Sequence, residues 1–433
     1  MHKSENRRVS PARQLSGELI VPGDKSISHR AIMFASLAEG DTHISGLLRG
    51  EDCLSTLKAF QALGVEVDDQ AADRLVVKGR GLHGLKEPGD VIDCGNSGTT
   101  MRLMSGILAA QPFFSVLTGD RYLRQRPMKR VIQPLSRMGA KILGREGHSK
   151  APLAIDGGRL KPTEYHSPIA SAQVKSALLL AGMQTEGTTT VYEPHLSRDH
   201  TERMLRYFGV NLESFSGGAR VSGLARLEGR EVEVPGDISS AAFFLVAGLL
   251  VPNSELLLKN VGVNPTRSGI IDILQLMGGS IELLNRRELS GEPVADLLVK
   301  SSDLHGINIA GELIPRAIDE FPVVSVAAVF AEGVTTIQDA EELRVKETDR
   351  IAAMCSSLGA LGADIAPLAD GMKIRGGEML RGGRVDSHGD HRIAMSMAVA
   401  ALRAHEEVEI VDTACTETSF PGFWQLLSGL CRS

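Results

Sequence analysis

Basic and hydroxyl side chains crowd the start of an apolar helical stripe near the amino terminus. The stretch VPGDKSISHRAIMFASLAEG repeats apolar residues at helical spacing from Ile27 onward, and Asp24 or Ser26 can cap the helix. Lys25 and Arg30 then lie in or next to its first turn. Cations there face the positive end of the helix dipole, at a cost of up to about 1 kcal/mol each. We therefore expect an anion to bind at this helix start.

Three further segments concentrate cations in a similar way. SRDHTER contains Arg198, and DSHGDHR contains Arg392. RVKETDR, read as a helix, puts Lys346 and Arg350 one turn apart on one face, with Glu347 beside Arg350. Each segment alone is compatible with a solvated helix face. Only their joint occurrence beside helix-capping turns, together with the basic run RQRPMKR, indicates binding sites.

An acidic side chain stands in apolar surroundings in the stretch IPRAIDEFPVV. Asp319 is flanked by Ala, Ile, Phe and Val, with Glu320 next to it. A carboxylate with little water around it can act as a general base, because desolvation raises its affinity for a proton. The alternative is that Asp319 caps a helix beginning near Pro322, and the sequence leaves both readings open.

Several common catalytic motifs are absent or do not fit. GRGLHG matches the pattern GxGxxG, but Pro88 follows too soon for a phosphate-binding helix to start there. The chain has no GxxxxGK[ST] loop and no GxSxG elbow. His388 and His391 have no further ligand cluster, so no metal site is expected.

The composition is that of a globular protein with more than one domain. Its 433 residues exceed one ordinary core, and a net charge of -6 with 4% aromatic residues argues against nucleic-acid binding. The longest apolar run, residues 241–251, is too short to span a membrane, and residues 1–20 contain no signal core. Five scattered cysteines indicate neither disulfides nor zinc. We expect a cytoplasmic protein without nucleic-acid or membrane partners.

The opening motif returns in the second half of the chain, where VPGDISSAAFFLVAGLL begins at Val234. In each half, an Ala/Leu-rich helix, a Gly-marked turn and a β-prone run appear three times, mostly followed by a second helix ending in Gly. The sequence thus predicts six β-α-β-α-type units in two similar domains. The last copy lacks a final strand, and we expect LSGELIV, residues 15–21, to complete it.

Six capping stretches precede the first helices of these units: GDKSIS, GNSGTT, ASAQVK, GDISSA, AIDEF and HGDHRI. Their exposed amides would provide anion sites if the units point the same way. GDISSA carries no base, and for this stretch we favour a purely capping role.

The ordered motifs resemble those of the 5-enolpyruvylshikimate-3-phosphate synthase family, in its SAQVK and RPMKR subgroup. They are PGDKSISHR, GNSGTTMRL, RPMKR, SAQVKSALLLAG, SRDHTERM, AIDEFP, RVKETDRI and GDHRIAM. The resemblance implies an α/β enolpyruvyl transferase fold, an inside-out α/β barrel of two three-unit domains around an active-site cleft. With the repeats, it places one domain at 22–234 and a discontinuous one at 1–21 plus 235–433. It also implies a monomer that uses small anionic substrates and no cofactor or metal.

The resemblance further implies transfer of the enolpyruvyl group of phosphoenolpyruvate to shikimate 3-phosphate. Asp319 would take the proton of the 5-hydroxyl, and Glu347 or Lys25 would protonate the phosphoenolpyruvate methylene. The implied contacts of shikimate 3-phosphate are Lys25, Ser26, Arg30, Ser171, Ala172, Gln173, Arg198, Asp319 and Lys346. Those of phosphoenolpyruvate are Lys25, Gly98, Arg126, Gln173, Arg350 and Arg392.

Some positions depart from the family pattern. Many members have a lysine in a C-T-x-K-[TS]-F-P stretch where this chain has Thr418, and some have a tyrosine where it has His200. Sister UDP-N-acetylglucosamine enolpyruvyltransferases share the six-unit fold, but they typically show K-N in place of Lys25-Ser26 and a loop cysteine before R-P, absent here. That activity and a non-catalytic anion-binding module are the alternatives. Because glyphosate occupies the phosphoenolpyruvate site in much of the family, Gly98 predicts at least partial sensitivity.

Overall fold

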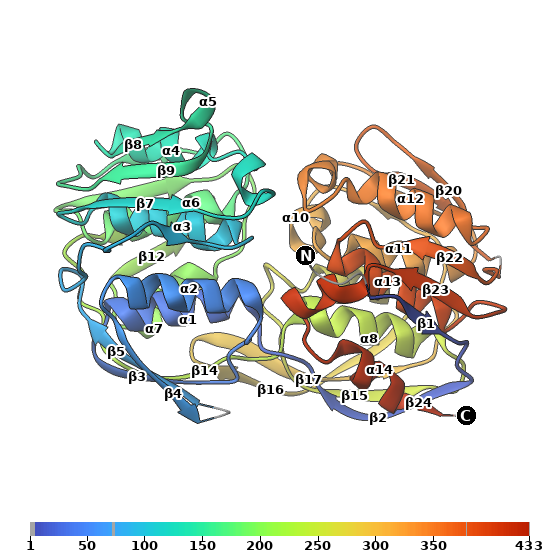
Figure 1. The fold of residues 1–433 in the computed structure, drawn as a ribbon. Coiled ribbons are helices and arrows are strands. Elements are labelled where there is room, and N and C mark those ends of the chain that lie inside the picture. The colour runs from blue at the N-terminus through green and yellow to red at the C-terminus, as the bar shows by residue number, and fades with distance from the viewer. Residues whose placement is uncertain (1–4, 72–73, 378, 433) are drawn as a thin grey trace. The chain divides into compact units, whose positions relative to one another are not determined.

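The chain folds into two compact units, each with its own hydrophobic core (Figure 1). The computed structural model describes residues 5–71, 74–377 and 379–432. We call the unit of Gly23–Val234 and Glu288–Glu292 the Lys25 unit. The unit of Met1–Pro22, Pro235–Arg287 and Pro293–Ser433 is the Asp319 unit. The chain therefore passes between the units inside both VPGD segments.

Three repeats build the Lys25 unit, and their sheets have the orders β14-β3-β5-β4, β6-β7-β9-β8 and β10-β11-β13-β12. In each sheet the first two strands are parallel and the other neighbours are antiparallel. The strands are β3 (Glu39–Ser45), β4 (Glu66–Ala71), β5 (Arg74–Arg80), β6 (Ile92–Asp93), β7 (Phe114–Thr118), β8 (Lys141–Gly144), β9 (Lys150–Asp156), β10 (Glu164–His166), β11 (Thr188–Tyr192), β12 (Leu212–Phe215), β13 (Gly218–Ser222) and β14 (Glu231–Glu233). The helices are α1 (Lys25–Leu37), α2 (Glu51–Ala62), α3 (Gly98–Ala109), η1 (Leu123–Gln125), α4 (Lys129–Arg137), α5 (Arg145–His148), α6 (Ala172–Gly182) and α7 (His200–Tyr207).

The Asp319 unit contains three sheets with the orders β16-β17-β15-β2-β24, β18-β19-β21-β20 and β1-β23-β22. The strands are β1 (Arg7–Val9), β2 (Gln14–Ile20), β15 (Glu255–Gly262), β16 (Ser280–Leu289), β17 (Glu292–Lys300), β18 (Asn308–Ile309), β19 (Val334–Ile337), β20 (Asp364–Pro367), β21 (Met372–Arg375), β22 (Gly383–Asp386), β23 (Val408–Val411) and β24 (Cys431–Arg432). The helices are α8 (Ile238–Leu250), α9 (Gly269–Leu276), α10 (Leu313–Ala317), α11 (Phe321–Phe330), η2 (Glu341–Val345), α12 (Arg350–Ala360), α13 (His391–Ala401), η3 (Thr413–Thr418) and α14 (Phe423–Leu430).

The first helix of each repeat belongs to the interior, whereas the second helix buries one face. All residues of α8 are buried, and α11 and α13 pack against it and against each other (Figure 1). In contrast, α2 buries fewer than half of its residues. Apolar residues therefore surround α8, while α2 shows the one-sided pattern of a surface helix. Within the described residues, no helix has the length and hydropathy that a membrane span requires.

The predicted ends of the second helices are confirmed at five repeats. The glycine after each helix has a φ between +85° and +97°, a left-handed conformation that favours glycine. These residues are Gly64, Gly139, Gly209, Gly278 and Gly362. Each reverses the chain so that it can return as a strand of the same sheet.

The expected role of LSGELIV was wrong. Strand β2, which contains most of this stretch, pairs in parallel with β15 of the fourth repeat. The sixth repeat is instead completed by β1, which pairs antiparallel with β23. The physical reason lies in the position of LSGELIV directly before a VPGD segment. Strand β14 precedes the other VPGD segment, and it likewise pairs in parallel with the strand that follows the first helix of a unit, β3.

Candidate active-site residues

The start of α1 presents two side chains on a helix capped by Asp24. The Asp24 Oδ1 accepts a hydrogen bond from the Ile27 backbone N at 2.9 Å, so Asp24 and not Ser26 is the cap. The Lys25 side chain is 26% exposed, and its ammonium pairs with Asp52 on α2. Ser26 is half-buried beside it. Both side chains can therefore be reached by a ligand at this helix start.

Arg30 lies in the protein interior behind Ser26. It donates hydrogen bonds to Thr201 Oγ1 at 2.7 Å, to the Ser26 carbonyl at 2.9 Å and to Ser176 Oγ at 3.0 Å. Burial lowers the pKa of Arg30 to about 10, and the side chain remains a cation at neutral pH. Arg30 thus ties α1 to α6 and α7, and it places a positive charge behind the exposed helix start.

The starts of α3 and α6 meet in the same unit. The Gln173 side-chain amide donates to Thr99 Oγ1 at 3.0 Å, and its carbonyl oxygen accepts from Arg102 Nη1 at 2.7 Å. A Cβ placed on Gly98 would lie 2.9 Å from Arg102 Nη1 and 3.3 Å from Arg126 Nη1. Gly98, Arg126 and Gln173, which the family resemblance assigns to the phosphoenolpyruvate site, are therefore neighbours.

Arg102 is a residue that the sequence analysis did not single out. It is 5% exposed and also donates to the Pro127 carbonyl at 3.2 Å. A signal was present, because Arg102 follows the helix start at Gly98 by four residues and Arg30 follows the helix start at Lys25 by five. This spacing puts a cation one turn behind each helix start.

A buried ion-pair network lies behind the expected shikimate 3-phosphate contacts Ser171, Ala172 and Arg198, which are all half-buried. Lys175 is 2% exposed, and its ammonium lies 2.7 Å from a carboxylate oxygen of Glu193 and 2.7 Å from one of Glu202. Burial lowers the pKa of Lys175, but the two carboxylates raise it more, so that it lies above its ordinary value. Glu193 also accepts from the Ser197 backbone N, which fixes the chain directly before Arg198.

Asp319 lies among three cations in the other unit. Its Oδ1 is 3.5 Å from Lys346 Nζ and 3.6 Å from Arg350 Nη1, and its Oδ2 is 3.9 Å from Arg267 Nη1. The N-cap of α11 is Glu320, without a side-chain cap bond, so Asp319 does not serve as the cap. The side chain is 16% exposed. The cations favour the carboxylate form, which is the form that can accept a proton.

Arg350 is held by two further acids. Its Nε lies 2.8 Å from Asp390 Oδ2, and its Nη2 lies 2.7 Å from Glu347 Oε2. Burial alone would lower the pKa of Arg350, but Asp390, Glu347 and Asp319 raise it above its ordinary value. The expectation that Lys346 and Arg350 share a helix face was wrong, because α12 begins only at Arg350 and Lys346 follows η2. The two cations nevertheless converge on Asp319.

Arg392 lies near this group at the start of α13. Its side chain is 12% exposed, and Nη1 is 3.8 Å from the buried Glu320 Oε1. Its backbone N donates to Asp390 Oδ1 at 2.8 Å, which caps the helix. The structure thus brings together five predicted residues of the Asp319 unit: Asp319, Lys346, Glu347, Arg350 and Arg392.

The two residues that depart from the family pattern, His200 and Thr418, make contacts within the protein. His200 is 2% exposed, and its Nδ1 lies 2.8 Å from Glu292 Oε1. The Thr418 hydroxyl donates to the Cys415 carbonyl within η3. Among the residues that the structure describes, no three His, Cys, Asp or Glu side chains are grouped to hold a metal ion.

Comparison with known proteins identifies one family. Residues 9–427 match the family described as EPSP synthase (3-phosphoshikimate 1-carboxyvinyltransferase). A protein of Syntrophotalea carbinolica named 3-phosphoshikimate 1-carboxyvinyltransferase is 64% identical over 427 residues, covering 99% of both chains. One of the same name from Geobacter sulfurreducens is 63% identical over 417 residues, or 96% of this chain and 97% of the relative.

Solved structures agree with this match. EPSP synthase from Acinetobacter baumannii is 45% identical, with a TM-score of 0.91 over 99% of this chain and 98% of that chain. The enolpyruvyl transferase NikO from Streptomyces tendae, at 17% identity, has a TM-score of 0.80 over 99% of this chain and 97% of that chain. The predicted α/β enolpyruvyl transferase fold is therefore confirmed.

Proposed function

Because the chain belongs to the EPSP synthase family, we propose that it transfers the enolpyruvyl group of phosphoenolpyruvate to the 5-hydroxyl of shikimate 3-phosphate and releases phosphate. The observation that carries this proposal is the match to curated 3-phosphoshikimate 1-carboxyvinyltransferases along nearly the whole of both chains. The cationic groups in both units support it. Both substrates carry a phosphate and a carboxylate, which arginine and lysine bind by charge-assisted hydrogen bonds.

In this proposal, residues of the Lys25 unit bind shikimate 3-phosphate. Lys25, Ser26 and the start of α6 contact the substrate, and Arg198 binds its phosphate. Arg30 holds a positive charge behind Ser26, while its own nitrogens donate to protein atoms. The ion pairs of Lys175 with Glu193 and Glu202 hold the backbone directly before Arg198. The Arg198 side chain itself is half-buried.

Three arginines bind phosphoenolpyruvate in this proposal. They are Arg126 next to Gly98, Arg350 next to Asp319 and Arg392 next to Glu320. Arg126 and Gln173 lie beside Gly98, and Arg350 lies beside Asp319. Each guanidinium is already oriented by an internal acid or amide, such as Asn96 for Arg126 at 2.9 Å. Little side-chain entropy is then lost when the anion binds.

Two proton transfers accompany formation of the new bond. Asp319 takes the 5-hydroxyl proton while the hydroxyl oxygen bonds to C2 of phosphoenolpyruvate. Glu347 or Lys25 gives a proton to C3, and the methylene becomes a methyl group. The result is a tetrahedral ketal that still carries the phosphate. Asp319 suits the first step because the surrounding cations keep it ionised before the reaction.

Phosphate departure completes the reaction. The bond between C2 and the phosphate oxygen breaks, and a methyl proton returns to the group that delivered it, which restores the carbon–carbon double bond. The proton held by Asp319 leaves with the phosphate. The arginines stabilise the charge that develops on the leaving oxygen, an effect worth several kcal/mol when the cations are already in place.

The test is the reaction itself, followed by phosphate release and by the vinyl proton signals of the product. Release should require shikimate 3-phosphate and should not occur with UDP-N-acetylglucosamine. Asp319→Ala should lower turnover by roughly 10²-fold or more. Asp156→Ala, which removes an exposed carboxylate paired with Lys141, is the matched control and should retain turnover. Release with the nucleotide sugar alone would establish the alternative activity, and no release with either acceptor would favour a non-catalytic module.

A further inference from the structure

Arg267 is a buried cation beside Asp319 that contacts neither substrate in the proposed reaction. It lies in the turn between β15 and α9, in the segment VNPTRSG, and is 3% exposed. Its guanidinium points into the Asp319 group, with Nη1 3.9 Å from Asp319 Oδ2. A cation this deep in the protein requires specific partners, because burial of a charge is unfavourable without them.

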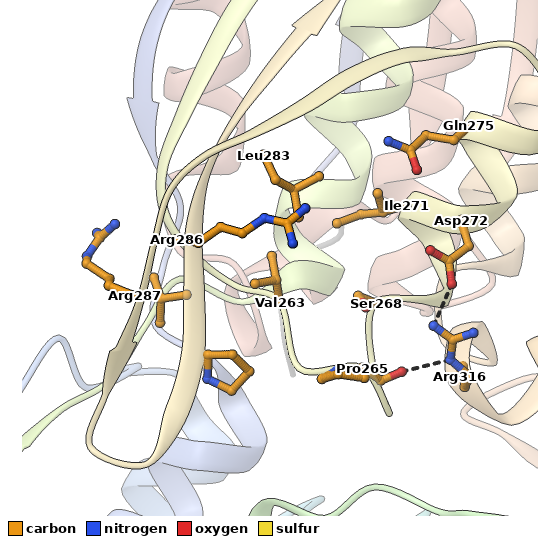
Figure 2. Close-up of a pocket in the computed structure, with 12 residues that line it drawn as sticks. Val263, Pro265, Ser268, Ile271, Asp272, Gln275, Leu283, Arg286, Arg287 and Arg316 are labelled. Carbon is orange, nitrogen blue, oxygen red and sulfur yellow. Dashed lines mark hydrogen bonds and ion pairs between the residues drawn. The ribbon is translucent and has the colours of Figure 1, made fainter.

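The turn that carries Arg267 is held from both sides. On the inner side, the Asn264 side chain accepts from the backbone N and the hydroxyl of Thr266 at 2.9 and 2.8 Å. On the outer side, Arg316 donates to the Pro265 carbonyl at 2.7 Å and pairs with Asp272 at 2.5 Å (Figure 2). Pro265 and Arg316 border a pocket of about 410 Å³ on this face. The backbone at Arg267 is therefore fixed, and hydrogen bonds to Glu320 and Ser239 set the direction of its side chain.

Arg267 compensates three carboxylates at once. Its Nη1 lies 3.1 Å from Glu320 Oε1, and its Nη2 lies 3.4 Å from Asp237 Oδ1, in addition to the contact with Asp319. Nη2 also donates to Ser239 Oγ at 2.5 Å. Glu320 is 1% exposed, and its Oε2 has no hydrogen-bond partner within the described chain. Without Arg267, this buried carboxylate would repel the neighbouring Asp319.

Glu320 connects Arg267 to Arg392, the arginine proposed to bind phosphoenolpyruvate. Its Oε1 accepts the Ser239 hydroxyl, lies next to Arg267 Nη1, and is 3.8 Å from Arg392 Nη1. One oxygen atom therefore connects the cation beside the proposed base with the cation proposed to bind phosphoenolpyruvate. Asp319 and Arg392 come from different repeats, and this link relates their positions.

We infer that Arg267 and Glu320 are positioning residues for the proposed reaction: Arg267 orients and keeps ionised the base Asp319, and Glu320 orients Arg392. This inference rests on the proposed function. Both side chains act through another residue, since each is buried against protein atoms. The arrangement predicts separate kinetic signatures for the two residues, which a general loss of folding would not produce.

The test compares Arg267→Gln, Arg267→Lys and Glu320→Gln with wild type. Arg267→Gln should lower kcat by about tenfold or more, because the base is misplaced. It should also move the acid limb of kcat/KM to higher pH, because one cation beside Asp319 is lost. Arg267→Lys should lower kcat but leave the acid limb near its wild-type position, since the charge remains. Glu320→Gln should raise the KM for phosphoenolpyruvate more than the Kd for shikimate 3-phosphate.

Several charged groups surround the base, and each variant leaves all of them in place except the one that it replaces. Those that face Asp319 or its partners are Lys346, Arg350, Arg267, Arg392, Glu347, Asp390, Glu320 and Asp237. Arg375→Gln is the matched control, because it removes an exposed arginine of β21 that pairs with Asp364 and does not belong to the Asp319 group. It should leave the acid limb unchanged even if thermal stability falls.

The outcomes separate this inference from the proposed function. An active wild type whose folded Arg267 and Glu320 variants keep kcat, KM and the acid limb would overturn the inference alone. The same holds if Arg375→Gln shifts the acid limb as far as Arg267→Gln does. If Arg267→Gln fails to fold, Arg267→Lys and Glu320→Gln decide the question by the same criteria. A wild type without activity would overturn both the proposed function and this inference.

Discussion

The two VPGD copies begin helices of the same length and opposite character. After Asp24, α1 carries Lys25, His29 and Arg30. After Asp237, the equivalent positions of α8 are apolar, namely Ile238, Ala242 and Phe243. Both aspartates cap their helices, with bonds of 2.9 Å to Ile27 N and to Ser239 N. The shared motif therefore encodes a capped helix start, and the residues after it decide what that start contacts.

The second copy obtains its cation from elsewhere in the chain. In the Lys25 unit the charge belongs to the helix itself, and Lys25 is partly exposed. In the Asp319 unit, Arg267 reaches the helix start from the turn after β15 and is buried against acids. In our proposal, this local structure receives a ligand in the Lys25 unit and supports catalytic side chains in the Asp319 unit. The residue directly after the aspartate, Lys25 or Ile238, would then distinguish the two uses.

The largest expected effect comes from making the first copy resemble the second. Lys25→Ile places at the start of α1 the residue type that begins α8, and it removes the cation that we propose contacts both substrates. We expect kcat/KM to fall by roughly 10²-fold, because a charge-assisted contact to each substrate is lost. Steady-state kinetics with each substrate varied would measure this. Lys141→Ile, at an exposed lysine of β8, is the control, and equal losses in both variants would contradict the assignment.

A smaller effect is expected at the start of α3. Gly98→Ala would place a methyl group 3.3 Å from Arg126 Nη1 and 2.9 Å from Arg102 Nη1, so both guanidinium groups must shift. Overpacking of this kind costs about 1 to 3 kcal/mol. Glyphosate is longer than phosphoenolpyruvate and should lose more affinity. Inhibition constants and KM values for wild type and Gly98→Ala check this, and equal factors would show that Gly98 does not discriminate by length.

A pH effect should distinguish the two helices as well. Burial lowers the pKa of His29 to about 3, with its Nδ1 bonded to Thr56 Oγ1 at 2.7 Å, whereas α8 has Ala242 at this place. Between about pH 6.5 and 3 the unfolded chain binds a proton that the folded chain does not, so the contribution of His29 to stability falls as the pH falls through this window. The loss approaches about 1.4 kcal/mol per pH unit.

Urea unfolding of wild type and His29→Gln at pH 7.5 and 5.5 would measure this term. The variant should lose less stability than wild type between the two pH values. Thr56→Val, which removes the hydrogen-bond partner and keeps the imidazole, is the control and should keep the wild-type pH dependence. Equal pH dependence of wild type and His29→Gln would show that His29 is not the group responsible.

Local sequence patterns predicted the helices and their ends, but they did not predict which distant strands pair. Apolar periodicity and the terminal glycines located the helices, because both depend on neighbouring residues. The partner of LSGELIV was missed because strand pairing depends on distant segments, and short β-prone runs look alike. Arg267 was missed for a related reason, since it lies in a turn and meets its acids only through folding. We expected Lys346 and Arg350 to lie together on one helix face, but no single helix contains both residues. Their side chains meet at Asp319 instead.

Substitution of two equivalent serines tests most directly the claim that the two VPGD helix starts have different roles. Ser26 and Ser239 are equivalent, but Ser239 is 2% exposed and bonds to Glu320 and Arg267. Calorimetry should show that Ser26→Ala weakens shikimate 3-phosphate binding about tenfold without a change in Tm, since a bond to a charged ligand is lost. Ser239→Ala should lower Tm by about 3 to 6 °C and leave the Kd within about threefold of wild type. Equal weakening of binding by both variants, or a fall in Tm alone for Ser26→Ala, would contradict the account.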